Sequence, residues 1–179
     1  PAPAGTPTER PDPFLDIPRR LFYTAITIRS CHGAVAGTDA TQYSPAGTRT
    51  RGQFAKVVVL GFGLPFCTPP GSPDFTDVPP SHFAYVYIET GYHAGIVSGF
   101  DQQSCIAAGA AYPCYLPNRI VTRAQLTKLT VRAADFPIIT PTSRHQTFSH
   151  VPPSNPFYAF IEPAGARHVY AARAVRGKI

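Results

Sequence analysis

The stretch Phe75-Thr-Asp-Val-Pro79 recurs along this chain of 179 residues and determines how the chain divides. It returns as Phe14-Leu-Asp-Ile-Pro18 and as Phe148-Ser-His-Val-Pro152. Later landmarks return in the same order: Tyr85-Val-Tyr-Ile88 with Tyr23-Thr-Ala-Ile26 and Tyr158-Ala-Phe-Ile161, Gly95-Ile-Val-Ser-Gly99 with Gly33-Ala-Val-Ala-Gly37, Tyr115-Leu-Pro117 with Tyr43-Ser-Pro45, and Thr122-Arg-Ala-Gln-Leu-Thr-Lys128 with Thr50-Arg-Gly-Gln-Phe-Ala-Lys56. Ordered matches of this kind indicate tandem repeats that bury a shared core.

Each full repeat predicts a helix, a loop and a second helix. In the stretch 81–93, Ala84, Tyr85, Ile88 and Tyr92 fall on one helical face, and Gly95 then marks a turn. The second helix should begin at Thr122-Arg-Ala-Gln125 and at Thr50-Arg-Gly-Gln53, because Ser or Thr followed three residues later by Glu or Gln is a capping box. We expect Thr50, Gln53, Thr122 and Gln125 to act as caps.

The repeats predict four segments. We expect residues 1–13 to form a Pro-rich linker or arm, 14–74 a first repeat, 75–147 a second repeat with a cysteine-containing insertion, and 148–179 a partial third repeat. In the third repeat, Asn155 before Pro156 is an N-cap signal, whereas Pro163 falls inside the expected helix, at a cost of about 3 kcal/mol if interior.

The four cysteines are Cys31, Cys67, Cys105 and Cys114. Their spacing fits no CxxC metal site, and an even number in a Pro-rich chain favours two disulfides in an oxidising compartment over buried thiols. Cys105 and Cys114 lie in the insertion and should bond to each other, which leaves Cys31 to bond with Cys67.

The composition excludes several classes of protein. The chain is 44% hydrophobic, enough for a core, but has no apolar run long enough to span a membrane. It contains no Met, so we expect a processed product or a fragment. A net charge of +6 favours polyanionic partners, yet no nucleic-acid motif accompanies it, so nucleic acid is not expected.

No recognised catalytic, metal or cofactor motif accompanies the six histidines. Asp77 with His82, or His145 with His150, could be drawn into a site, but neither pair has a known spacing. We therefore expect a chain without enzymatic activity or cofactor.

The order of motifs at 75–89, 95–100 and 121–125 closely resembles the S-layer homology (SLH) repeat. This resemblance implies an all-α, pseudo-threefold bundle of helix–loop–helix repeats, here with long Pro/Gly-rich loops. It also implies an extracellular position at a bacterial cell surface and anchoring to anionic cell-wall or envelope polysaccharide.

By the same resemblance, ligand contacts fall on Arg51 and Arg123, with Asp16 and Asp77 at the start of each repeat. Free N–H groups at the helix N-terminus beside each arginine would favour an anion. As surface groups, the arginines should contribute little to stability; the alternative is that they are solvated first-turn residues.

A second function class is a structural subunit of a surface layer, sheath, filament or larger envelope complex, which acts through contacts with another surface protein. An incomplete third repeat would leave apolar surface uncovered, so residues 148–179 are expected to contact another chain. Deleting residues 164–179 should then abolish association.

Overall fold

The computed structural model describes residues 14–17, 23, 26, 30, 33–39, 41–138, 140 and 146–166. These residues form five helices: α2 (Arg51–Gly61), α3 (Tyr85–His93), α4 (Gln102–Ala107), α5 (Arg123–Ala133) and α6 (Tyr158–Ala166). They include no strand, only an isolated antiparallel bridge between Thr50 and Ile120. The helical class is confirmed, and the pseudo-threefold arrangement stays a prediction. None of the described helices is long and apolar enough to cross a membrane.

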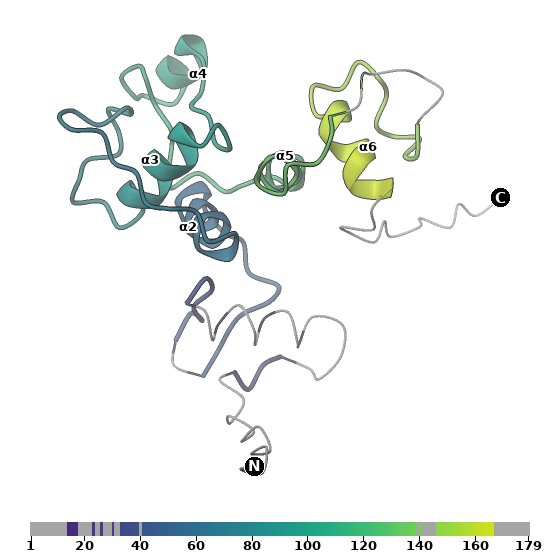
Figure 1. The fold of residues 1–179 in the computed structure, drawn as a ribbon, viewed down its shortest axis with the longest axis horizontal. Coiled ribbons are helices and arrows are strands. Elements are labelled where there is room, and N and C mark those ends of the chain that lie inside the picture. The colour runs from purple at the N-terminus through teal and green to yellow at the C-terminus, as the bar shows by residue number, and fades with distance from the viewer. Residues whose placement is uncertain are drawn as a thin grey trace, which may run out of the picture.

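Helices α2 and α5 lie in the middle of the molecule, with α3 and α4 on one side and α6 on the other (Figure 1). Helix α2 packs against α3 and α5, and α5 packs against α6. The main core joins residues of α2, α3 and α5 to buried loop residues: Ala55, Val58, Phe75, Val78, Ala84, Ile88, Ile96, Val97, Tyr115 and Leu129. A smaller cluster holds Phe14, Ile17 and Ile26.

Both predicted capping boxes are present. The Gln53 amide donates to the Thr50 hydroxyl at 3.3 Å, and the Thr50 amide donates to the Gln53 side chain at 3.0 Å. Thr122 and Gln125 make the same pair of bonds at the start of α5. The capping role expected for these four residues is confirmed.

The other predicted helix starts are displaced. Helix α3 begins at Tyr85 rather than at residue 81, because a tight turn precedes it, in which the His82 amide donates to the Pro79 carbonyl at 2.8 Å. Helix α6 begins at Tyr158, and Asn155 accepts a bond from the Phe157 amide before the helix starts. Pro163 does lie inside α6.

Two glycine pairs explain the Gly-x-x-x-Gly spacing of the first two repeats. Gly33 and Gly95 have φ of +69° and +70°, a left-handed conformation that side chains disfavour. Gly37 and Gly99 have no room for a side chain, because a Cβ would collide with the Phe14 ring and the Phe75 ring, respectively. The first glycine therefore turns the chain, and the second allows a close approach to the phenylalanine.

The insertion folds into α4 and contains the predicted Cys105–Cys114 disulfide. The second predicted disulfide is not formed, because Cys67 is an exposed free thiol. The Cys67 backbone is instead fastened to α3, where its amide donates to the Thr90 hydroxyl at 2.9 Å. Cys31 lies outside the described residues.

Candidate functional site

Asp77 holds the chain where it returns after the insertion. Its two carboxylate oxygens accept the backbone amides of Tyr115 and Leu116 at 2.8 and 2.7 Å. Leu116 has a φ of 57°, in the left-handed region, so the two bonds secure a backbone turn that its own side chain disfavours. Asp77 therefore has a structural task within the predicted site.

Asp16 makes the corresponding contacts near the N-terminus. It accepts the amides of Tyr43 and Ser44 at 2.8 and 2.6 Å, and Ser44 also has a φ of 57°. The bond from Tyr43 lowers the pKa of the Asp16 carboxyl below its ordinary value. The two aspartates predicted as ligand contacts thus share one local geometry, in which backbone amides occupy both oxygens.

Arg51 is buried, with 6% of its surface exposed, so the expectation of a surface group is wrong for this residue. Its Nε donates to the Tyr115 carbonyl and its Nη2 to the Ser98 carbonyl, both at 2.9 Å. The guanidinium also lies over the rings of Tyr115 and Phe100, at 4.3 and 4.6 Å from their centroids. Burial lowers the pKa of Arg51. The side chain therefore joins α2 to the two loops that flank α4.

The N-terminus of α2 does not offer the free N–H groups expected for an anion. The Arg51 amide donates to the Arg119 carbonyl at 2.8 Å, and the Gly52 amide donates to the Pro117 carbonyl at 2.9 Å. The next amide, that of Gln53, donates to the hydroxyl of the N-cap residue Thr50. This expectation is wrong because the returning chain after Tyr115 covers the helix end.

Arg49 is the corresponding arginine near the N-terminus, and it was not predicted from the sequence. Its Nη2 donates to the Tyr43 carbonyl at 2.7 Å, much as Arg51 donates to the Tyr115 carbonyl. The repeat pattern gave no signal for it, since the position that matches Arg49 in the next copy is Val121. Arg123, by contrast, is exposed at the start of α5.

Arg51 borders a cavity of about 160 Å³. This cavity, the Lys128 groove, is lined by residues from four parts of the chain: Arg51, Ser98, Gly99, Phe100, Gln125, Lys128, Leu129 and Phe157. None of them is acidic. Burial lowers the pKa of Lys128, and the charges of Arg132 and Arg51 lower it further. The groove therefore gathers positive charge without a carboxylate in its wall.

A second groove of about 580 Å³ lies beside α2. This Lys56 groove is lined by the stretch 34–38, Tyr43, Arg49, Gln53, Phe54, Lys56, Val57, Phe83 and Leu126. The Nζ atom of Lys56 lies 5.9 Å from the centroid of the Tyr87 ring. The Nζ atom of Lys128 lies 5.8 Å from the centroid of the Phe160 ring. The two lysines thus occupy matching positions on α2 and α5, and only the Lys128 groove contains Arg51.

Comparison with known proteins identifies the central part of the chain. Residues 74–127 match the S-layer homology domain. This SLH match covers Asp77, α3, the insertion, Tyr115 and the start of α5. It associates the chain with the cell surface, in agreement with the predicted resemblance for that segment.

A curated relative also matches part of this chain. The chain is 31% identical over 102 residues to an endoglucanase of Bacillus sp. (strain KSM-635). The alignment covers 57% of this chain but 9% of that protein. The similarity is therefore to a small part of a much longer protein.

Proposed function

We propose that this chain is a non-enzymatic anchoring module that binds anionic cell-wall or envelope polysaccharide outside a bacterial cell. It would be built from SLH-like repeats at 14–74 and 75–147 and a partial repeat at 148–179, arranged as a pseudo-threefold bundle. The SLH match at 74–127 supports the family assignment of the central segment. The recurrence of the Asp16 and Asp77 contacts and of the two capping boxes supports a repeated architecture.

The main support for this proposal is the positive charge of the Lys128 groove, which no carboxylate in the groove wall offsets. Burial lowers the pKa of Lys128, and the like charges of Arg132 and Arg51 lower it further, so the charged lysine is disfavoured in this site. A carboxylate, phosphate or ketal acid of a polymer would offset that cost and accept hydrogen bonds from the lysine. The ring of Phe157 in the same wall offers apolar surface for a sugar.

Within this groove, Lys128 is the residue best placed for a ligand. Arg51 already donates two bonds to carbonyls, so its part is mainly to supply positive charge. Arg123 is exposed and remains a candidate contact at the start of α5. Asp16 and Asp77 would act by shaping the loops around the grooves, since their oxygens are used by backbone amides.

The test compares Lys128→Gln with Lys56→Gln in binding to purified cell-wall sacculi. Both changes remove one positive charge near an aromatic ring at matching helix positions. We expect Lys128→Gln to weaken binding about tenfold, corresponding to about 1.4 kcal/mol, and Lys56→Gln to change it much less. Thermal midpoints of both variants check that the fold is retained.

Equal losses for the two variants would contradict a specific role of the Lys128 groove, because general positive charge would then explain the binding. No loss for Lys128→Gln would contradict it as well. A catalytic role is tested separately by incubating the chain with wall polymer and looking for released fragments; their appearance would contradict a non-enzymatic module.

The alternative is an assembly subunit that acts by protein–protein contacts. Several large apolar side chains are exposed on different segments, among them Leu15, Phe66 and Ile106 at 80%, 61% and 66%. The predicted role of residues 164–179 in association falls mostly outside the described residues. Concentration-dependent association of the free chain without any affinity for sacculi would favour this alternative.

A further inference from the structure

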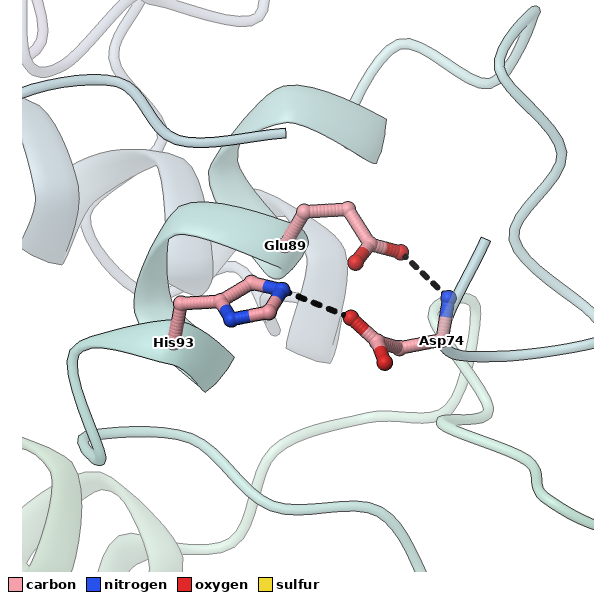
Figure 2. A group of neighbouring side chains, drawn as sticks. All are labelled: Asp74, Glu89 and His93. Atoms are coloured by element: carbon pink, nitrogen blue, oxygen red, sulfur yellow. Dashed lines mark hydrogen bonds and ion pairs between the residues drawn. The ribbon is translucent and has the colours of Figure 1, made fainter. Parts of the chain in front are cut away.

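A histidine and two carboxylates meet at the end of α3, away from both grooves. Glu89 and His93 are one helical turn apart on α3, and Asp74 approaches from the segment that leads to Phe75 (Figure 2). The Asp74 Oδ2 lies 2.8 Å from the His93 Nε2. One donor atom from each of the three side chains lies within 4.8 Å of the others.

Glu89 is fully buried, yet one of its oxygens has no partner. The side chain is 0% exposed. Its Oε1 accepts the Asp74 amide at 3.2 Å, whereas Oε2 has no hydrogen-bond partner among the described residues. In Figure 2 the oxygen that does not bind this amide lies on the side of the Asp74 carboxylate and the His93 ring. A buried carboxylate oxygen without a partner is costly, and a cation or a proton would satisfy it.

The third repeat shows which of the groups around Glu89 the fold itself requires. Glu162 occupies the matching position in α6, is 2% exposed, and accepts the Thr147 amide at 2.8 Å. In these two repeats the fold thus uses a buried glutamate to hold the residue before the phenylalanine. At the positions of Asp74 and His93, however, the third repeat has Thr147 and Ala166. Asp74 and His93 are therefore not needed for the structural task.

We propose that Asp74, Glu89 and His93 form a binding site for a divalent first-row metal ion of the zinc class. Imidazole nitrogen with carboxylate oxygens suits zinc, whereas calcium takes about six to eight oxygen ligands. Ligand bonds of about 2.0–2.2 Å require only small side-chain shifts from the observed spacing. The side chains of His93 and Asp74 are 40% and 30% exposed, so solvent can reach the ion and supply a fourth ligand.

The ion would join the end of α3 to the segment before Phe75, which Glu89 already fastens through the Asp74 amide.

The test is a titration of the full chain with Zn²⁺ alone, after chelator treatment and removal of the chelator. All proteins carry Cys31→Ser and Cys67→Ser, so that thiols do not bind the ion. We expect one ion per chain, and a loss of affinity of at least about tenfold in Asp74→Asn and in His93→Gln, since even outer partners of metal ligands have effects of this size. The matched controls, Glu162→Gln and His150→Gln, should retain the affinity.

A second readout is independent of affinity. Co²⁺ in a four-coordinate site with nitrogen and oxygen ligands should give visible absorption bands that His93→Gln abolishes. Thermal midpoints without metal check that the variants are folded. Absence of saturable binding in the parent chain, or equal binding by all variants, would overturn the proposal, because binding would then come from other histidines or not occur.

Discussion

The central segment, residues 74–133, and the C-terminal segment, residues 146–166, begin alike but are completed differently. In both, a buried glutamate accepts a hydrogen bond from the backbone amide of the residue before a phenylalanine. Of these two segments, only the central one has, within the described residues, an aspartate that holds a returning chain. Phe75 is 3% exposed, whereas Phe148 is only half-buried. The returning chain thus helps to cover Phe75, through Tyr115, whereas Phe148 stays partly exposed among the described residues around it.

The largest expected effect is the loss of the aspartate that holds this returning chain. Asp77→Ala leaves the amides of Tyr115 and Leu116 without their acceptors, and hydrogen bonds to a charged group contribute about 1.5–3 kcal/mol each. We expect a loss of roughly 3–5 kcal/mol in the free energy of unfolding, measured by denaturant titration. His150→Ala is the matched change in the C-terminal segment, and we expect an effect within about 0.5 kcal/mol because His150 is exposed. Similar losses for the two variants would contradict the comparison.

The next effect concerns the arginine that reaches into the central segment. Arg51→Ala removes two bonds to the carbonyls of Tyr115 and Ser98 from a buried position. We expect a loss of about 2–4 kcal/mol, since a charged donor is lost together with its packing. Arg123→Ala changes the matching residue of α5, which is exposed, and should cost less than about 1 kcal/mol. An Arg51→Ala variant as stable as the parent would show that these contacts do not support the fold.

The smallest effect is a pH dependence of stability that arises from Glu89. The pKa of Glu89 is raised from 4.5 to about 7, chiefly by burial, so the folded state holds a proton that the unfolded state has lost between these values. Stability should therefore fall as the pH rises from 4.5 to 7, by on the order of 1–3 kcal/mol from this group.

Glu89→Gln keeps an acceptor for the Asp74 amide but cannot ionise. Its stability without metal should fall less than that of the parent chain over this pH range, as measured by thermal or denaturant unfolding with a chelator present. Glu162→Gln provides the comparison in α6. A parent chain and a Glu89→Gln variant with identical pH profiles would contradict the raised pKa.

Local sequence signals predicted the helix caps and the insertion disulfide. Thr-x-x-Gln specifies a capping box within four residues, and Cys105 and Cys114 are close enough in sequence for the insertion to bring them together. The Gly-x-x-x-Gly spacing correctly marked a turn. Each of these features depends on neighbours along the chain, so the sequence is sufficient to find it.

Contacts between distant residues could not be predicted in the same way. The recurrence of Asp77 was visible, but its bonds to the amides of Tyr115 and Leu116 depend on the path of the insertion. The burial of Arg51 likewise depends on the chain that returns over α2. Glu89 and His93 have a helical spacing that metal ligands use, yet only the folded chain brings Asp74 beside them.

The most direct test of the anchoring proposal is a sedimentation assay with purified sacculi before and after chemical removal of their anionic polymer. We expect the chain to bind intact sacculi, to bind less tightly as salt is raised because charge drives the contact, and to lose binding when the polymer is removed. Equal binding to intact and stripped sacculi, or no binding to either, would contradict a module that anchors through anionic polysaccharide.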